Sequence, residues 1–296
     1  MSSGWLDGKA AVITGAGRGI GRAEALLLAA EGAHVTVNDV DADAAGAVAQ
    51  EIRSAGGRAE PNGDDVSTWS GAEHAVRAVI EVNGHLDVVV NNAGILRDAM
   101  SFSLTEEHWD DVVRVHLKGH AAMAHFAGAH WRERAKADQD STGGRIVNTV
   151  SESGLYGLAG QVNYAAAKAG IAAMTVVLAR ELRKYGVTVN AIAPRARTRM
   201  TETVLGALLP AEGQFDEWDP ANVAPVVAWL ASDAASDVTG QVLVVNGDKV
   251  HLMHGWHRVG RIANDGRRWT VGDLEDRRAE LFGELGSKLP PMGFGE

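Results

Sequence analysis

The sequence predicts an α/β fold, built as one doubly wound parallel sheet with helices on both faces and followed by a C-terminal extension. Short apolar runs alternate with longer alanine-rich stretches, which is the pattern of repeated strand–helix–strand units. Runs such as VVVNN, IVNTV and VLVV are apolar almost throughout, as expected for strands that helices cover on both sides. Together these observations indicate a parallel sheet between two layers of helices.

The apolar runs give the expected strands, and the alanine-rich stretches give the expected helices. Strands are expected at Ala10–Thr14, His34–Asp39, Arg58–Pro61, Leu86–Asn91, Arg145–Val150, Thr188–Ala193 and Gln241–Val245. Helices are expected at Ile20–Glu31, Ala42–Ser54, Ser70–Val82, Thr105–Lys136, Tyr164–Tyr185 and Pro220–Ala231. Asp219 caps the last of these, ahead of a proline at the first helical position. Thr270 and Asp273 have capping-box spacing, which predicts a final helix toward Leu285.

Composition and charge exclude several classes of protein. With 296 residues, 46% hydrophobic and 22% charged, the chain can bury the core of one large domain. A formal charge of −10 argues against sequence-independent nucleic-acid binding. No uninterrupted apolar run has the length of a membrane span, and the N-terminus does not resemble a signal peptide. Cysteine is absent, so thiolate catalysis and cysteine zinc sites are excluded, no metal is expected, and a cytoplasmic location is expected.

A glycine-rich loop, ITGAGRGIGRAEAL from Ile13, stands where the first expected strand turns into the first helix. Gly15, Gly19 and Gly21 would let the backbone turn tightly, approach a pyrophosphate and pack the helix on the sheet. Amides at the helix N-terminus would then face the phosphates. Glycines also suit an ordinary turn, but their place between a strand and a helix favours a bound dinucleotide and a Rossmann-like sheet.

An acidic residue ends the second expected strand, in VTVNDV. Asp39 would accept hydrogen bonds from the adenosine ribose, and its carboxylate would repel a 2′-phosphate, which predicts NAD rather than NADP. Aspartate also commonly occupies turns, and Arg18 in the glycine loop could pair with a 2′-phosphate. The place of Asp39 at the carboxyl end of its strand favours NAD.

Tyr164 and Lys168 lie four residues apart in NYAAAKAG, which places both on one face of the expected helix. Alanine favours helices, so the stretch also suits a buried helix with two polar side chains. Oxidation of an alcohol needs a group that takes the hydroxyl proton, and a tyrosine with a pKa of about 10 needs a nearby positive charge to act near neutrality. Ser151 follows the run IVNTV, where it could hydrogen-bond a substrate oxygen or simply form a turn.

These motifs together resemble the short-chain dehydrogenase/reductase family. TGAGRGIG, NNAG at Asn91–Gly94, Ser151 and Tyr164-x-x-x-Lys168 stand in the family's order and spacing, from about Leu6 to Gly247. The segments NNAGILRDAMSFSLTEEHWDDVVRVHLKG, YGLAGQVNYAAAKAG and IAPRARTRMTETV are similar to the (3R)-hydroxyacyl-CoA dehydrogenase units of type 2 multifunctional enzymes. The resemblance implies an NAD-binding domain over residues 1–250. It also implies that residues 251–296 form an extension packed on the same domain or on a neighbouring subunit.

The resemblance also implies the residues of a site. Tyr164 would be general base in oxidation and general acid in reduction, with Lys168 and Ser151 as the other catalytic residues. Cofactor-binding residues would be Gly15, Arg18, Gly19, Ile20, Gly21, Asp39, Asp65, Val66, Asn92, Ala93, Gly94, Tyr164, Lys168 and Thr198.

Two positions depart from the family's pattern. His116 stands in VHLKG where many members have an asparagine that helps hold a water near the lysine, and it could keep that role or only pack. PRART has Arg195 in place of a glycine and one residue fewer before Thr198, so the spacing to the expected nicotinamide contact is changed.

The sequence therefore predicts an NAD-dependent oxidoreductase that interconverts a secondary alcohol and a ketone, with a 3-hydroxyacyl-CoA type substrate. In the family, the segment after the sixth strand, here Arg195–Asp219, covers the substrate. This covering segment mixes apolar residues with Arg195, Arg197 and Arg199, which could bind CoA phosphates or equally pair with acids of the chain. A hydroxysteroid or other bulky hydrophobic alcohol is the alternative substrate. A catalytically silent dinucleotide-binding regulatory protein is the alternative of another class. The family also implies a homodimer or homotetramer, formed through the two longest helices.

Overall fold

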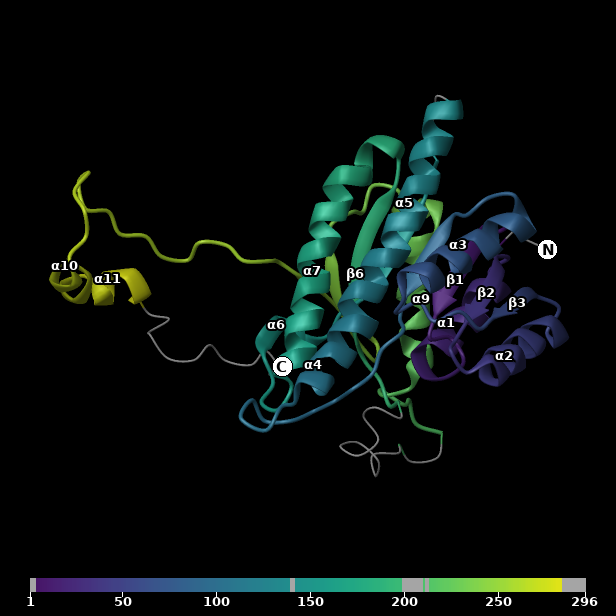
Figure 1. The fold of residues 1–296 in the computed structure, drawn as a ribbon, viewed down its shortest axis with the longest axis horizontal. Coiled ribbons are helices and arrows are strands. Elements are labelled where there is room, and N and C mark those ends of the chain that lie inside the picture. Colours follow the sequence, from purple (N-terminus) through teal and green to yellow (C-terminus); the bar gives the residue numbers. More distant parts are fainter. Residues whose placement is uncertain (1–3, 139–141, 199–209, 211–212, 284–296) are drawn as a thin grey trace. The chain divides into compact units, whose positions relative to one another are not determined.

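A computed structural model gives the fold of the chain (Figure 1). It describes residues 4–138, 142–198, 210 and 213–283. The chain divides into two compact units, Met1–Met253 and His254–Glu296, and each is considered by itself. The first unit holds the sheet and every buried hydrophobic cluster among the described residues.

The first unit is built on one eight-stranded sheet in the order β3-β2-β1-β4-β5-β6-β7-β8. The strands from β1 to β7 pair in parallel, and only β8 is antiparallel. The carboxyl ends of the parallel strands therefore share one edge of the sheet. The strands are β1 Ala10–Thr14, β2 His34–Asn38, β3 Arg58–Asn62, β4 Val88–Asn91, β5 Arg145–Thr149, β6 Thr188–Arg195, β7 Val242–Asn246 and β8 Lys249–Met253.

Helices cover both faces of this sheet, which confirms the predicted fold class. The helices are α1 Gly19–Ala30, α2 Ala42–Ser54, α3 Trp69–Asn83, α4 Glu106–Val113, α5 Gly119–Asp138, α6 Glu152–Tyr156, α7 Val162–Leu182 and α9 Ala224–Ala231, with α10 Val271–Asp276 and α11 Arg278–Phe282 in the second unit. Short turns of helix lie at Arg183–Tyr185, Pro220–Asn222 and Asp233–Ala235.

The alternation of side chains along β1 shows how the two layers are held. Ala11 and Ile13 point into a cluster with residues of α1, α2 and α9, whereas Ala10 and Val12 point into a second cluster with residues of α3, α5 and α7. All four side chains are buried. A strand with both faces covered needs apolar residues at every position, which is why the runs in the sequence are continuous rather than alternating.

The helix predicted over Thr105–Lys136 is wrong as one continuous α-helix. Thr105 does cap its start, where the side chain accepts a hydrogen bond from the backbone N–H of His108. A π-helical turn, Arg114–Lys118, then separates α4 from α5. Such turns often occur at functional sites, and this one carries His116.

Two elements were not predicted. Helix α6 is only five residues long and contains a glycine, so it shows no helical period. Strand β8 follows β7 through a two-residue turn at Gly247 and Asp248, with Asn246 paired to Lys249. The Gly-Asp dipeptide after an apolar run is a hairpin signal, and it could have revealed this strand.

The edges of the sheet and one of its faces complete the description. Pro61 lies in β3, an edge strand, where a missing N–H is tolerated. The other edge, β8, leaves Val250 and Leu252 more than half exposed.

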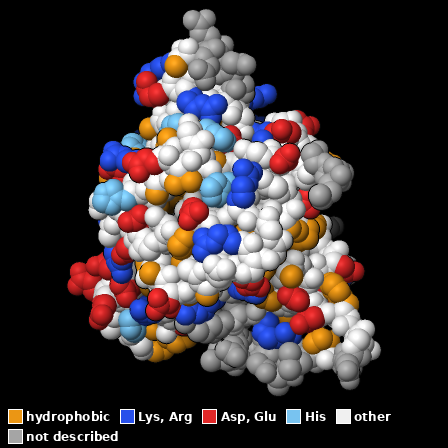
Figure 2. Space-filling model, turned by 90° about the vertical axis from the view of Figure 1, so that its right-hand side faces the viewer, with side chains coloured by type: hydrophobic (Ala, Val, Ile, Leu, Met, Phe, Trp, Pro, Cys, Tyr) orange, Lys and Arg blue, Asp and Glu red, His pale blue; other side chains and the backbone are white. Residues whose placement is uncertain are grey.

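On the face shown in Figure 2, acidic and basic side chains are interspersed, so the excess negative charge does not form a single field there.

One described helix segment, Val162–Tyr185, is long and apolar enough by length and composition to cross a membrane. It corresponds to α7 and the short turn after it. Polar residues interrupt it, and Ile171, Ala179 and Leu182 are buried in the core of the first unit. The apolar composition of this helix is accounted for by its place against the sheet.

Candidate active site

The glycine loop and the NNAG turn lock together at the carboxyl edge of the sheet. Gly15 has a φ of +64°, and a Cβ built there would lie 2.8 Å from the Cα of Ala93. The Asn92 side chain donates from Nδ2 to the carbonyls of Thr14 at 3.0 Å and of Gly15 at 3.1 Å. Thr14 Oγ1 accepts from the backbone N–H groups of Asn92 and Ala93. The structure thus brings together two loops far apart in the sequence that were both predicted to bind the cofactor.

The residues at the start of α1 fit a dinucleotide phosphate. The helix is 12 residues long, and Arg18, at the position before it, makes no side-chain cap. The first amides are therefore not bonded to a capping side chain, and the helix dipole favours an anion there. Gly21 cannot carry a side chain, because a Cβ would lie 2.5 Å from Asn92 Nδ2. Gly19 lies beneath Thr198, whose Cγ2 would be 3.6 Å from a Cβ at Gly19.

Asp39 lies directly after β2 and is tied to the glycine loop. Its Oδ2 accepts from the N–H of Gly17 and its Oδ1 from the N–H of Asp41, both at 3.0 Å. Arg18, the residue that argued for a 2′-phosphate, donates to Asp41 at 2.5 Å. Each partner favours the charged form of the other, so the pKa of Arg18 is raised and that of Asp41 lowered. Sequence reasoning missed Asp41, although VNDVD shows a second acid two residues on.

Asp65 and Val66 lie in the loop between β3 and α3. Asp65 Oδ1 accepts from the N–H of Ser67 at 3.0 Å, and Arg114 lies 3.8 Å from the other carboxylate oxygen. Val66 is buried. Ile20, in the first turn of α1, packs against the core below the glycine loop.

Tyr164 and Lys168 lie on one face of α7, as their spacing predicts. The Lys168 ammonium lies 5.6 Å from the centre of the Tyr164 ring and donates to the Thr149 carbonyl at 2.5 Å. Ser151 lies between β5 and α6, where its Oγ accepts from the N–H of Ser153 at 3.2 Å, and it also hydrogen-bonds the Tyr164 side chain. The structure therefore places the three predicted catalytic residues together.

Burial controls the ionisation of this pair. It raises the pKa of Tyr164 to about 12, against the hydrogen bond from Ser151, which lowers it. Burial also lowers the pKa of Lys168 to about 7. The sequence predicted that neighbouring groups would lower the pKa of Tyr164. In the protein alone the desolvation of the phenol outweighs those groups, so the pKa is raised instead.

His116 lies against the pair from the π-helical turn. Its ring meets the Tyr164 ring edge to face, with 5.2 Å between centres. Nε2 lies 3.0 Å from the N–H of Ile95 and 2.8 Å from the Ile95 carbonyl. A Cβ on Gly94 would collide with Cε1 of the same ring, which gives the predicted Gly94 a steric role. The π-helical turn thus holds His116 in contact with Ile95 and Tyr164 and close to Gly94.

Asn163 is a site residue that sequence reasoning missed. It is fully buried, and its Nδ2 donates to the carbonyls of Arg97 and His108 at 3.0 and 3.1 Å. Its Oδ1 accepts from the N–H of Tyr164 at 2.8 Å. Asn163 therefore fixes the start of α7 to the segment after β4, directly beside the tyrosine. Its place next to Tyr164 in NYAAAKAG was the available signal.

The arginines of the covering segment are paired with acids. Arg195 makes a two-pronged ion pair with the buried carboxylate of Glu152, at 2.5 and 2.7 Å. Arg197 makes a similar pair with Asp216, at 2.8 and 3.0 Å. Arg199 lies outside the described residues. The sequence left open whether these arginines bind CoA phosphates or pair with acids of the chain. For Arg195 and Arg197, the structure shows pairing with acids of the chain.

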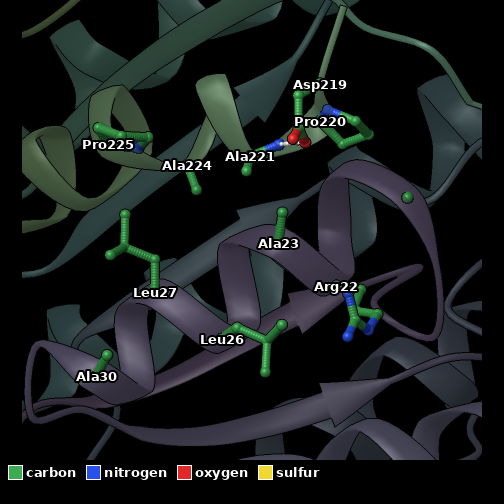
Figure 3. Close-up of a pocket in the computed structure, with 11 residues that line it drawn as sticks. Arg22, Ala23, Leu26, Leu27, Ala30, Asp219, Pro220, Ala221, Ala224 and Pro225 are labelled. Atoms are coloured by element: carbon green, nitrogen blue, oxygen red, sulfur yellow. Dashed lines mark hydrogen bonds between the residues drawn. The ribbon is translucent and has the colours of Figure 1, made fainter. Parts of the chain in front are cut away.

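A groove of about 640 Å³ lies beside the glycine loop rather than at Tyr164 (Figure 3). Its walls are α1 and the segment from Asp219 to Pro225. Figure 3 shows Ala23 pointing from α1 toward Ala221, and Leu27 pointing toward Ala224 and Pro225, across the groove. Its lining is mostly apolar and contains none of the catalytic candidates.

Comparisons with known proteins agree with this geometry. The family model for short chain dehydrogenases matches residues 9–206 of the chain. The chain is 48% identical over 284 residues to hydroxyacyl-CoA dehydrogenase ChsB1 of Mycobacterium tuberculosis, which covers 94% of this chain and 89% of that protein. It is 39% identical over 284 residues to peroxisomal multifunctional enzyme type 2 of Mus musculus, across 92% of this chain but 35% of that enzyme.

A solved structure gives the same result. The crystal structure of a short chain dehydrogenase from Mycobacterium avium matches with a TM-score of 0.88 and 46% identity, over 98% of this chain and all of that one. Members of the family bind a nicotinamide dinucleotide, which the glycine loop fits. The chain therefore belongs to the short-chain dehydrogenase family and is an oxidoreductase that acts on CH–OH groups.

Proposed function

We propose that the protein is an NAD-dependent dehydrogenase that interconverts a 3-hydroxyacyl-CoA and the corresponding 3-oxoacyl-CoA. The observation that carries the reaction is the contact of Ser151, Tyr164 and Lys168 beside the glycine loop. The substrate class is supported by the relative named hydroxyacyl-CoA dehydrogenase, which matches nearly the whole chain.

In this proposal Tyr164 takes the hydroxyl proton of the alcohol as the C–H bond breaks. Ser151 donates a hydrogen bond to the substrate oxygen, and the Lys168 ammonium favours the phenolate form of Tyr164. Bound NAD⁺ supplies the hydride acceptor and a further positive charge. Burial opposes phenolate formation in the protein. The positive charges of Lys168 and of NAD⁺ are therefore both needed for Tyr164 to act as a base near neutral pH.

The preference for NAD rests on two carboxylates. Asp39 holds the position at the end of β2, where it would accept from the adenosine ribose and repel a 2′-phosphate. Asp41 binds Arg18, the cation that would otherwise suit that phosphate. The remaining cofactor contacts are assigned to Gly15, Gly19 and Gly21 at the pyrophosphate, and to the other residues expected from the sequence, which are Ile20, Asp65, Val66, Asn92, Ala93, Gly94 and Thr198.

We also propose a homodimer or homotetramer, formed through α4, α5 and α7. Large apolar side chains on the outer surface of these helices support it, with Trp109 at 39% and Val177 at 51% exposure. The extension beyond residue 250 would pack on the first unit or on a neighbouring subunit. A cytoplasmic location remains our expectation, because a chain without cysteine suits a reducing compartment.

The test combines one variant with a substrate panel. Tyr164→Phe removes the only oxygen of this side chain, so kcat for NAD⁺ reduction should fall by at least about a thousandfold, while NAD⁺ binding measured by calorimetry is kept. The panel pairs 3-hydroxyacyl-CoA and hydroxysteroid substrates with NAD⁺ and NADP⁺, followed by nicotinamide absorbance. Turnover by Tyr164→Phe at the native rate would refute the mechanism. Turnover of steroids alone would refute the acyl-CoA assignment and favour the alternative substrate.

A further inference from the structure

The buried ion pair between Glu152 and Arg195 has no part in the proposed mechanism, although it adjoins a catalytic residue. Glu152 directly follows Ser151 and is the first residue of α6, whereas Arg195 is the last residue of β6. The guanidinium donates from Nε and Nη2 to the two carboxylate oxygens, at 2.5 and 2.7 Å. Glu152 is 8% exposed. A position where the family's pattern has a glycine therefore carries a charge, and the partner of that charge lies next to Ser151.

Stability alone does not account for a pair of this kind. Replacing a buried ion pair by apolar residues of similar volume often leaves a protein as stable as before, or makes it more stable. A two-pronged contact between a guanidinium and a carboxylate does fix the distance and the orientation of both groups. The pair is therefore suited to holding two segments of backbone in one arrangement.

The two segments are those that separate where strand pairing ends. Strands β5 and β6 pair as far as Thr149 and Ile192, and the N–H of Val150 then donates to the Ile192 carbonyl at 2.7 Å. Strand β5 ends there, while β6 continues to Arg195, which is paired with Asn246 of β7. Arg195 thus belongs to the sheet, and its side chain binds the segment that has just left the sheet.

Helix α6 depends on such contacts, because five residues are too few for a helix to be stable by itself. Ser151 stands at its start, and the Ser151 carbonyl accepts from the N–H of Gly154 at 2.9 Å. Gly154 lies against α7, where a Cβ built on it would be 2.7 Å from the Cβ of Lys168. The helix is therefore held by α7 at Gly154 and by the sheet through Glu152 and Arg195.

We propose that the ion pair of Glu152 with Arg195 positions Ser151 for catalysis. The proposal rests on the proposed function, in which the Ser151 hydroxyl hydrogen-bonds the substrate oxygen beside Tyr164. Hydrogen bonds weaken steeply as their distance and angle depart from the optimum, and small misplacements of reacting groups cost large factors in rate. Glu152 and Arg195 are thus positioning residues, which act on the reaction through the serine.

The experiment is a double-mutant cycle between Glu152 and Ser151. Glu152→Gln keeps the size of the side chain but places an amide N–H against a guanidinium N–H, so that one of the two contacts is lost. Ser151→Ala removes the hydroxyl. The measurements are kcat and KM for alcohol oxidation by the native protein, both single variants and the double variant, with thermal unfolding of each. Enzyme in excess over substrate gives the rates of the slow variants.

A residue that acts through Ser151 should matter only where the serine is present. Glu152→Gln should lower kcat about tenfold in the native background, with KM for NAD⁺ unchanged. In the Ser151→Ala background the same change should alter kcat by less than about twofold. Equal losses in the two backgrounds would overturn the proposal, since they would indicate damage that does not pass through the serine. Native kcat in the Glu152→Gln variant would also overturn it.

These failures differ from a failure of the proposed function. Slow Ser151→Ala and inactive Tyr164→Phe variants would leave the proposed function intact, whatever the result at Glu152. A Ser151→Ala variant with native kcat would instead refute the part of the serine in the reaction, and the positioning role with it.

The matched control is a second two-pronged pair between an arginine and a glutamate. Arg22 donates to Glu51 from Nε at 3.1 Å and from Nη2 at 2.5 Å, and this pair joins α1 to α2. Glu51→Gln disturbs the same kind of contact without touching α6, so it should keep the native kcat. A loss equal to that of Glu152→Gln would overturn the proposal, because it would show that disturbing any such pair is enough.

A second measurement does not depend on turnover. Hydrogen exchange followed by mass spectrometry compares the backbone amides of α6 with those of β5 in the native protein and in Glu152→Gln. The α6 amides should exchange at least about tenfold faster in the variant, because a short helix that loses one support opens more often. The β5 amides should exchange as in the native protein. Native exchange throughout α6 would overturn the proposal even if kcat falls.

Discussion

At the scale of single residues, the buried carboxyl group of Glu24 is the least expected feature. Glu24 lies on the inner face of α1 with 0% exposure, and neither carboxylate oxygen has a hydrogen-bond partner among the described residues. Burial raises the pKa of this group to about 8. The group is therefore kept neutral at pH 7 by its surroundings, and it makes folding depend on pH.

The sign of that dependence follows from the direction of the shift. Below about pH 4.3 the carboxyl is neutral in both states, and it contributes no penalty. Between about pH 4.3 and pH 8 the unfolded chain ionises while the folded chain stays protonated, so stability falls as pH rises. By pH 7 the loss is on the order of 3 kcal/mol.

Glu24→Gln should remove this pH dependence while keeping the size of the side chain. We expect the variant to be more stable than the native protein at pH 8, with a smaller advantage or none at pH 5. Urea unfolding at both pH values measures the difference, and Glu81→Gln on the exposed surface of α3 is the control. Equal gains at the two pH values would contradict a titrating group at this position.

At the scale of elements, the π-helical turn is coupled to the NNAG loop through one steric contact. His116 is fixed by the Ile95 backbone at Nε2 and by the Tyr164 ring at its edge. It therefore cannot move away from a side chain placed on Gly94. The sequence indicates that NNAG is a strand-ending turn. It does not indicate that Gly94 leaves space for His116, which lies more than 20 residues later.

Gly94→Ala should therefore damage both stability and catalysis. Forcing a methyl group into a packed site costs about 1–3 kcal/mol, and displacement of the His116 ring would also move Tyr164. We expect a kcat at least about tenfold lower, measured with urea unfolding of the same sample. Gly46→Ala is the control, because this position in α2 has open space and alanine favours helices. Similar behaviour of the two variants would contradict the steric argument.

The elements also show what the sequence could and could not reveal. The parallel strands were predictable because burial on both faces leaves continuous apolar runs, as in β4 and β5. The π-helical turn was not predictable from the local sequence, and its His116 contacts residues of other segments. Likewise, the contact of Tyr164 with Lys168 follows from their spacing, and Ser151 was assigned from the family resemblance. The contacts of Asn163 were not predictable, because they depend on two carbonyls far along the chain.

At the scale of the whole molecule, the chain consists of two units with very different interiors. The hydrophobic clusters draw all their members from the first unit. The second unit contains the predicted capping box at Thr270 and Asp273, which opens α10, while Leu285 lies outside the described residues. Trp256 and Val271 are almost fully exposed, so this unit has little core of its own among the described residues.

A chain that ends after Met253 should therefore fold. We expect cooperative thermal unfolding and NAD⁺ binding close to those of the full chain, because the truncation removes no member of the clusters. Circular dichroism and calorimetry on the two proteins make the comparison. A truncated protein without a cooperative transition would show that the second unit contributes to the fold.

The two edges of the sheet, finally, differ in what they offer to another chain. The β3 edge carries Pro61 and exposed charged residues, which discourage further pairing. The β8 edge is antiparallel to its neighbour and presents Val250 and Leu252. Of the two edge strands, only β3 carries residues that disfavour strand addition. Two copies joined at β8 about a two-fold axis would leave only the two β3 edges, so edge-to-edge growth would be expected to stop at a pair.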